Sequence, residues 1–285
     1  MMRKRIIVLD SAGMAGHMIK KHLESFDDFE VIGVVFEKEN SNYGHFLCLD
    51  NFSNIIKFID SHKPDIVINT VRILVEESSL NPSEAILINS YLPRLLEKVY
   101  LHTSTKIIHL STDCVFSGKT GGYVETSIKD GKDMYSKSRA MGEIVNDKDL
   151  TIRTSFIGPV LIGKNEELFD WFLTKKGEVN GYVNAFWTGV STLELAINLE
   201  KAIRLDITGV YHLVPEEKIN KFILLKLLKD IWGKKDIKLN RYENKNIDKS
   251  LIDTRRLLYT GSYDKMFQEL KVYMDENRKL YSKYY

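Results

Sequence analysis

Two polar segments of this 285-residue chain could carry out acid–base chemistry together. The first begins at Ser111 and places a hydroxyl group at Thr112 next to a carboxyl group at Asp113. The second has helical character and holds Tyr135 and Arg139 four residues apart, so that both side chains share one helix face. Because a cation favours the phenolate form, it lowers the pKa of a neighbouring tyrosine. We therefore expect a lowered pKa at Tyr135, with Arg139 as the cation.

A tyrosine of this kind can pass a proton to a ketone oxygen while a nicotinamide supplies hydride. In this interpretation Thr112 holds the carbonyl group, and Asp113 orients sugar hydroxyl groups or relays a proton. On spacing alone, a tyrosine packed at the start of a helix beside a solvated Arg139 explains the pattern equally well. The two segments thus predict a candidate catalytic site, but their spacing alone does not distinguish a catalytic Tyr135 from a structural one.

Residues 10–17 form a candidate nucleotide-binding loop, because an apolar run precedes them and a segment with helical spacing follows. Gly13 and Gly16 stand at the second and third glycine positions of a Gly-x-x-Gly-x-x-Gly loop, which binds the pyrophosphate of a dinucleotide. Asp10 replaces the first glycine. A carboxylate there repels a pyrophosphate unless it points away or caps the helix amides. The pattern favours nucleotide binding, with a structural turn as the alternative.

The end of the next apolar run bears on the choice of cofactor. An acidic residue at this point binds the ribose hydroxyl groups of NAD, whereas an arginine binds the extra phosphate of NADP. This chain has Phe36 and then Glu37. Glu37 is therefore a candidate ligand for NAD, and the sequence does not favour NADP. A solvated loop charge explains Glu37 as well.

Short β-branched apolar runs alternate with longer segments of helical spacing in the first half of the chain. The runs cover residues 5–9, 30–36, 65–69, 106–110 and 151–153, and the helical segments cover 13–25, 52–62, 82–101 and 133–145. This alternation predicts a parallel sheet with helices on both faces, whose ligand site lies at the carboxyl ends of the strands. The fold class that we predict is α/β, a Rossmann-type doubly wound parallel sheet with a small mixed α/β substrate-binding lobe.

The alternation ends after Ser155. We predict a dinucleotide-binding domain over residues 1–155, to which residues 191–213 return as a helix and a strand. Residues 156–190 and 214–285 then form the substrate-binding lobe. Within it, residues 156–184 are expected to be rich in loops, with one amphipathic segment near residues 167–175.

Composition excludes several classes of function. The formal net charge of +2 gives no reason to expect nucleic acid or an anionic membrane as a partner. No apolar stretch has the length of a signal-peptide core or a membrane span, so we expect a cytoplasmic protein. Cys48 and Cys114 lack a Cys-x-x-Cys arrangement and are expected to be buried thiols, and no metal site is expected.

The order of motifs resembles the extended short-chain dehydrogenases/reductases, and among them the dTDP-4-dehydrorhamnose reductase-like group. The motifs that carry the resemblance lie at residues 13–17, 64–69, 111–118, 135–143, 153–158, 184–190 and 209–213. The resemblance implies NAD(P)H-dependent reduction of a 4-keto-6-deoxy sugar attached to a nucleoside diphosphate, for surface-polysaccharide precursors. A homo-oligomer is compatible with the sequence, which does not determine the oligomeric state.

The resemblance also implies a role for individual residues. The catalytic positions are Thr112, Asp113, Tyr135 and Arg139. The cofactor-binding positions are Ser11, Gly13, Met14, Ala15, Gly16, Glu37, Asn69, Thr70, Val71 and Ser111. The substrate-binding positions are Val115, Phe116, Asn184, Phe186 and Trp187.

Four positions depart from the family pattern, and all of them belong to the cofactor site. Arg139 replaces the family lysine, Asp10 replaces a glycine, Arg72 replaces a small residue, and Phe36 replaces the usual arginine. Arginine keeps the positive charge of lysine, but its planar fork needs different geometry. Two further interpretations therefore stay open: a non-redox relative that binds a sugar nucleotide, and a sugar-nucleotide epimerase.

Overall fold

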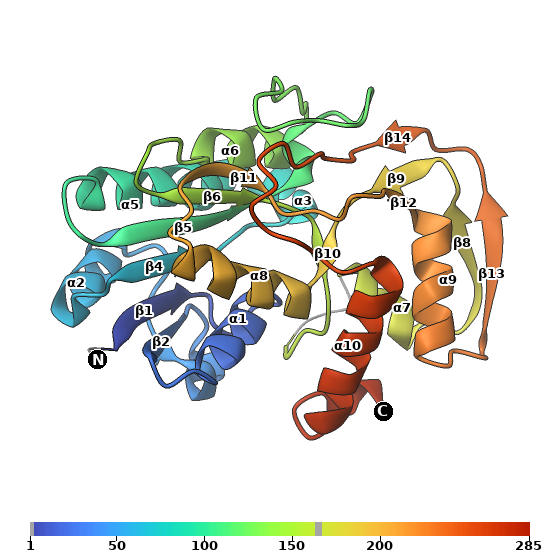
Figure 1. Ribbon diagram of the computed structural model, residues 1–285, viewed down its shortest axis with the longest axis horizontal. Coiled ribbons are helices and arrows are strands. Elements are labelled where there is room, and N and C mark those ends of the chain that lie inside the picture. The colour runs from blue at the N-terminus through green and yellow to red at the C-terminus, as the bar shows by residue number, and fades with distance from the viewer. Residues whose placement is uncertain (1–2, 163–166) are drawn as a thin grey trace.

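The apolar runs of the first half form the central sheet of the protein. The computed structural model describes residues 3–162 and 167–285, and its main sheet has seven strands in the order β11-β6-β5-β4-β1-β2-β3 (Figure 1). Every pairing in it is parallel. The strands are β1 (Lys4–Leu9), β2 (Phe29–Val35), β3 (His45–Phe46), β4 (Ile66–Asn69), β5 (Lys106–Ser111), β6 (Leu150–Arg153) and β11 (Gly209–His212). The predicted doubly wound sheet is confirmed.

Helices cover both faces of this sheet. Neighbouring residues of a strand point to opposite sides, and both sets are apolar here, so each face needs a covering layer. Ile6 and Val8 of β1 pack into the same core as α1 (Gly16–Leu23) and α8 (Thr192–Arg204). Ile7 and Leu9 pack on the other face, whose core includes α2 (Phe52–His62) and α5 (Leu92–Tyr100). The chain runs outward from β1 through β2 and β3 and then restarts at β4 on the other side of β1. Such a reversal of strand order places a crevice at the carboxyl ends of β1 and β4.

The predicted helix over residues 82–101 is interrupted. It consists of α4 (Pro82–Ile86), a π-helical turn η2 (Leu87–Tyr91) and α5, and a short helix α3 (Val75–Leu80) precedes it. The helix that carries Tyr135 is α6 (Met134–Gly142), and two 3₁₀ segments, η1 (Lys38–Tyr43) and η3 (Asp113–Val115), follow β2 and β5. A third, η4 (Ser282–Tyr284), ends the chain.

The smaller lobe stands at the right of Figure 1. Its elements are α7 (Leu168–Thr174), β8 (Gly177–Tyr182), β9 (Ala185–Trp187), β12 (Ile219–Asn220), α9 (Lys221–Ile231), β13 (Ile237–Tyr242) and β14 (Ile247–Asp248), and α10 (Tyr263–Glu276) packs beside it. β8 pairs with β13, and β9 lies between β12 and β14. Between the sheet and the lobe, β7 (Phe156–Ile157) pairs with β10 (Val190–Ser191).

The expectation that residues 156–184 are rich in loops misses β8. Only Val179 and Gly181 of that strand are buried, so its sequence offers little of the apolar alternation that predicts a strand. The expectation of two buried thiols is also wrong for Cys48, which is exposed because it follows the edge strand β3, where no further strand covers it.

One hydrophobic cluster includes residues from both the sheet and the lobe, so the two pack as a continuous body. The predicted domain boundaries therefore stay a proposal. In the part of the chain that the structure describes, no helix has the length and apolar character of a membrane span.

Candidate functional site

The two polar segments meet at the carboxyl edge of the sheet. Thr112 follows β5 directly, and the side chain of Asp133 caps the start of α6 by accepting a hydrogen bond of 2.8 Å from the Ser136 amide. A cavity of about 180 Å³ lies between these elements, with Thr112, Tyr135 and Arg139 in its wall. A cavity of about 150 Å³ accommodates benzene. The site therefore has room for one six-membered ring beside the tyrosine.

The pKa of Tyr135 is raised, which contradicts the expectation from the sequence. Burial of the phenol is the largest influence and raises the pKa. The charges of Arg139 and Arg72 and the neighbouring Thr112 hydroxyl act in the opposite direction and are outweighed. The phenol is consequently protonated at neutral pH.

Arg139 joins three elements of the sheet edge. Its Nη1 donates to the Val71 carbonyl at 3.3 Å, and its Nη2 donates to the Leu110 carbonyl. The guanidinium is 2% exposed, and burial lowers its pKa. Within the described residues its Nε has no hydrogen-bond partner. Arg139 thus anchors α6 to the ends of β4 and β5 and keeps one donor for another group.

The glycine-rich loop has a carboxyl group lying across it. Asp10 adopts a left-handed conformation with φ of 64°, which aspartate tolerates better than most residues. Its side chain lies against Gly13, where an added Cβ would overlap the carboxyl group. Burial raises the pKa of Asp10 to about 7, although Arg72 acts to lower it. At Gly16 a Cβ would collide with the Asp10 carbonyl, so this glycine lets α1 pack against the end of β1.

Several predicted cofactor residues have their side chains engaged within the protein. The hydroxyl of Ser11 donates to the carbonyl groups of Val34 and Tyr43 at 3.2 and 3.0 Å. Glu37 is exposed, and its carboxylate accepts a hydrogen bond from Asn40 at 2.9 Å. Neither side chain is directed by these bonds toward the glycine-rich loop.

The loop after β4 is fixed by its own polar groups. Asn69 accepts from the Val71 amide at 3.2 Å, and Thr70 donates to the Leu9 carbonyl at 2.7 Å. Val71 is buried, as are Met14 and Ala15 of the glycine-rich loop. These residues shape the crevice between β1 and β4, and their side chains do not expose polar groups to it.

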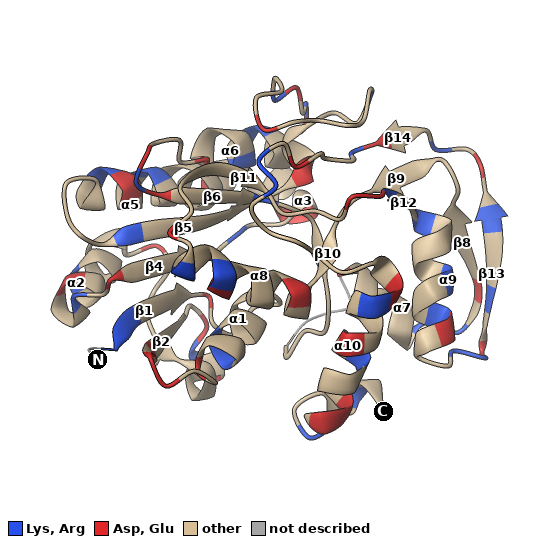
Figure 2. Ribbon diagram, viewed as in Figure 1, with Lys and Arg blue, Asp and Glu red and all other residues tan. Residues whose placement is uncertain are grey.

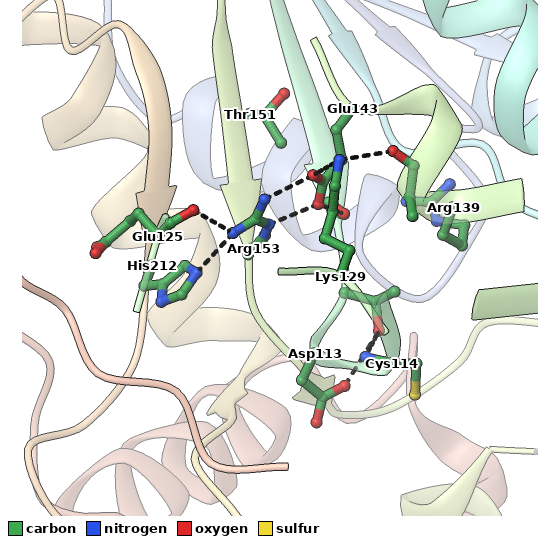
Figure 3. Close-up of polar contacts among 12 residues, drawn as sticks. Asp113, Cys114, Glu125, Lys129, Arg139, Glu143, Thr151, Arg153 and His212 are labelled. Carbon is green, nitrogen blue, oxygen red and sulfur yellow. Dashed lines mark hydrogen bonds and ion pairs between the residues drawn. The ribbon is translucent and has the colours of Figure 1, made fainter. Parts of the chain in front are cut away.

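A buried ionic network connects the end of α6 to β5 and β6 (Figure 3). Glu143, at the end of α6, accepts two hydrogen bonds of 2.7 Å from Arg153 of β6 and one of 2.7 Å from the Ser111 hydroxyl. Lys129 lies 3.0 Å from the same carboxylate. Ser111 therefore connects the end of β5 to Glu143, and its side chain is unavailable to a cofactor. Nothing in the sequence spacing marks Glu143 and Arg153 as a pair, so neither is among the predicted site residues.

A second and larger cavity opens in the lobe. It measures about 910 Å³, within the size range of small-molecule sites, and it shares Asp113, Cys114 and Ser155 with the wall of the tyrosine cavity. Its other walls carry aromatic and basic side chains: Trp171, Lys175, Lys176, Tyr182, Phe186, Trp187, Lys221, Lys245 and Lys249. Apart from Trp187 and Phe186, these residues are not among the predicted substrate ligands.

Three predicted substrate residues lie away from both cavities. Val115 and Phe116 are fully buried in a separate apolar cluster, where the Phe116 ring stacks on Tyr123 at 4.3 Å between centroids. The chain turns at η3 so that these two side chains face that core and neither cavity, and their role as ligands stays a prediction. Asn184 donates to the Glu243 carbonyl at 3.3 Å and thereby holds the loop before β14.

No group of three or more His, Cys, Asp or Glu side chains is arranged to hold a metal ion within the described ranges. Arg72, in the loop after β4, forms an ion pair with Glu167, the residue before α7. The Arg72 guanidinium also lies 4.8 Å from the centre of the Phe156 ring. This pair connects the loop after β4 to the lobe at the mouth of the tyrosine cavity.

Comparison with known proteins agrees with this geometry. A sequence model described as the RmlD substrate binding domain matches residues 4–247, most of the chain. The chain belongs to this family. The match spans the sheet-edge site and the wall of the lobe cavity except Lys249.

Named relatives include an enzyme and a protein subunit. A dTDP-4-dehydrorhamnose reductase from Aggregatibacter actinomycetemcomitans is 30% identical over 158 residues, which are 53% of this chain and 51% of that protein. The chain therefore matches about half the length of this relative. A methionine adenosyltransferase 2 subunit beta from Xenopus laevis is 24% identical over 250 residues, which are 81% of this chain and 72% of that protein.

Solved structures share the fold. A dTDP-4-dehydrorhamnose reductase from Bacillus anthracis in complex with NADP has a TM-score of 0.82 at 17% identity, covering 95% of this chain and 100% of that one. A UDP-glucose 4-epimerase from Thermotoga maritima with UDP-glucose has a TM-score of 0.74 at 19% identity, covering 96% and 99%. Reductases and epimerases thus share the architecture, and identities this low speak to the fold alone.

Proposed function

We propose that this protein reduces the ketone at C4 of a sugar attached to a nucleoside diphosphate, with a nicotinamide dinucleotide as the hydride donor. The observation that carries the proposal is the shared wall of the two cavities. Asp113 and Cys114 border both the cavity of Tyr135 and the basic lobe cavity. A sugar nucleotide whose diphosphate lies among the lobe lysines can therefore bring its sugar to the tyrosine. The named reductase relatives support the same reaction.

The residues of the sheet edge fit a dinucleotide if the carboxyl group of Asp10 is neutral. Gly13 and Gly16 offer a strand-to-helix loop of the right kind, and the Nε of Arg139 is a buried donor without a partner in the described chain. Asp10 opposes a pyrophosphate when it is ionised. With a pKa of about 7, its neutral form is accessible near neutral pH and can donate a hydrogen bond to a phosphate oxygen.

The dinucleotide supplies hydride when bound, and the chain supplies the proton. Tyr135 holds that proton at its hydroxyl, because its raised pKa keeps the phenol neutral. It donates the proton to the ketone oxygen, and the phenolate that results is stabilised by the charges of Arg139 and Arg72. Thr112 lines the same cavity as the phenol and positions the carbonyl group.

The decisive experiment combines binding and turnover. We expect dTDP or UDP to bind to the parent protein and to Tyr135→Phe with equal affinity in calorimetry. With a dTDP-4-keto-6-deoxy sugar and NADH or NADPH, Tyr135→Phe should lower turnover by about 10²–10⁴-fold, the usual contribution of a general acid. Tyr259→Phe is the matched control, because Tyr259 is 74% exposed. Turnover unaffected by Tyr135→Phe would reject the assigned role.

A second candidate function is sugar-nucleotide binding without redox chemistry. The similarity to a methionine adenosyltransferase subunit covers more of this chain than the similarity to the first reductase. The carboxyl group of Asp10 across the loop and the ties of Arg139 to two backbone carbonyls also favour it. This function predicts nucleotide binding with no measurable NADH or NADPH binding at any pH between about 5.5 and 8.5, a range that spans both states of Asp10.

A further inference from the structure

Two lysines of the lobe reach the shared wall of the two cavities. Lys221 is the first residue of α9, and Lys249 follows β14. Both line the lobe cavity together with Asp113 and Cys114. In Figure 2 the end of α9 nearest β9 and β12 is basic. These two ammonium groups thus lie on the sugar side of the cavity, since Asp113 adjoins the candidate catalytic Thr112.

The protein balances the two charges unequally: burial acts to lower the pKa of Lys249, but neighbouring groups that include Asp113 and Asp133 outweigh it and raise that pKa, whereas the Lys221 charge is less well compensated. Burial lowers the pKa of Lys221 to about 8, and its ammonium lies 4.6 Å from the centre of the Trp187 ring. Burial raises the pKa of the Cys114 thiol to about 11, so that this neighbour is neutral. Neither lysine forms an ion pair within 4.0 Å in the described part of the chain. The carboxylate of Asp113, in the cavity wall, favours the charged form of both lysines. Asp133 lies outside that wall and favours the charged form of Lys249 alone.

The diphosphate of a sugar nucleotide has other partners available. Lys175, Lys176 and Lys245 line the same cavity and are exposed. The one glutamate of the wall, Glu178, is already engaged by Lys238 and Asn240, each at 2.9 Å. Three accessible ammonium groups are enough to match the two negative charges of a diphosphate, so the inner pair is left for another anion.

We propose that the sugar bound here carries a carboxylate, which Lys221 and Lys249 bind beside the reacting carbonyl group. The proposal rests on the proposed sugar-nucleotide function and departs from the uncharged 6-deoxy sugar that the family resemblance implies. Both lysines are half-buried, and a partly desolvated amine such as that of Lys221 gains a charge-assisted bond when an anion arrives. The same two lysines thereby discriminate against uncharged sugars, because those leave the ammonium groups without partners.

The test compares UDP-glucuronate with UDP-glucose, a pair that differs only in the carboxylate, by calorimetry on the full chain. We expect the parent to bind UDP-glucuronate about 10- to 100-fold more tightly, the range for a hydrogen bond to a charged group. Lys221→Gln and Lys249→Gln should each reduce this ratio. Lys245→Gln is the control from the outer group and should weaken both ligands by the same factor. The dTDP forms of the two sugars replace the UDP forms if only dTDP binds.

The outcomes separate this proposal from the proposed function. Equal affinity for the two sugars would overturn the carboxylate proposal and leave the reductase proposal standing. The carboxylate proposal also fails if Lys221→Gln weakens both sugars alike, because the lysine then binds the diphosphate. Absence of binding by UDP, dTDP and their sugars would overturn both. Thermal melting of each variant checks that the fold is retained.

Discussion

Asp10 is the residue that most distinguishes this site from a glycine-rich loop of the usual sequence. Its ionised carboxyl group would repel a pyrophosphate, whereas its neutral form would not. Because burial raises the pKa of Asp10 to about 7, the change of state falls near neutral pH. We predict that NADH affinity is constant below about pH 6 and falls by about tenfold per unit above about pH 7, since binding is then linked to uptake of one proton.

Asp10→Asn should remove this pH dependence, because an amide does not ionise. It should also affect stability: a carboxyl group whose folded pKa is raised destabilises the fold as pH rises from about 4 to 7. Parent stability should therefore decline over that window relative to Asp10→Asn, which urea denaturation at several pH values would measure. Glu39→Gln is the control, because Glu39 is exposed and does not influence the pKa of Asp10, whereas Glu37 acts to raise that pKa. A parent whose NADH affinity stays flat from about pH 6 to 8.5 would contradict this account.

Glu37 bears on the choice between NADH and NADPH. Phe36 cannot pair with the extra phosphate of NADP, and the exposed carboxylate of Glu37 repels it. We predict no strong preference for NADPH over NADH and a gain in NADPH affinity in Glu37→Arg. Calorimetry with both reduced cofactors tests this. A clear NADPH preference in the parent would mean that another cation, such as Lys38 or Arg72, binds the phosphate.

Among the elements, α6 depends on Arg139 for its attachment to the sheet. The guanidinium fork donates to the carbonyl groups of Val71 and Leu110 at once, which one ammonium cannot reproduce with the same geometry. We predict that Arg139→Lys lowers the free energy of unfolding by about 1–3 kcal/mol, the cost of an unmade buried hydrogen bond, and that Arg139→Met lowers it further. Lys137→Met, an exposed site on the same helix, should be close to neutral in urea denaturation.

The elements also show how far sequence reasoning reaches. The helix predicted over residues 52–62 has the same bounds as the observed α2. The prediction succeeds because the apolar residues recur at helical spacing and Asn51 caps the start of the helix. Spacing places Tyr135 near Arg139 correctly but gives the wrong direction for the pKa of Tyr135. That sign depends on burial, which tertiary packing decides. The same limit applies to Val115 and Phe116, because spacing could not indicate that both side chains are buried in a separate apolar cluster.

Across the whole molecule, the network of Glu143 and Arg153 connects segments far apart in the chain. Arg153 donates to the Glu125 carbonyl at 2.8 Å and contacts His212 of β11 at 3.2 Å. His212 in turn contacts the Ile252 carbonyl at 3.0 Å, so the pair reaches the C-terminal third of the chain. The network therefore supports the sheet edge on which the candidate site is built (Figure 3).

Breaking this network should be costly because it is buried. Glu143→Gln leaves the Arg153 charge, 3% exposed, without its partner, and we predict a loss of about 3–5 kcal/mol in the free energy of unfolding. Glu30→Gln is the matched control, since the Arg5–Glu30 pair at 3.0 Å is solvent-accessible and should contribute less than about 1 kcal/mol. A double-mutant cycle with Arg153→Met isolates the coupling between the two residues.

The pH dependence of that loss provides an independent check. Burial acts to raise the pKa of Glu143, but Arg153, together with Lys129 and Ser111, outweighs it and holds the value at about 2. A carboxylate with a depressed folded pKa contributes stability above its ordinary pKa of 4.5, and that contribution disappears as pH falls toward 2. The difference in unfolding free energy between parent and Glu143→Gln should thus shrink progressively from about pH 5 to pH 2. A difference that stays constant over this range would show that the carboxylate charge does not stabilise the fold.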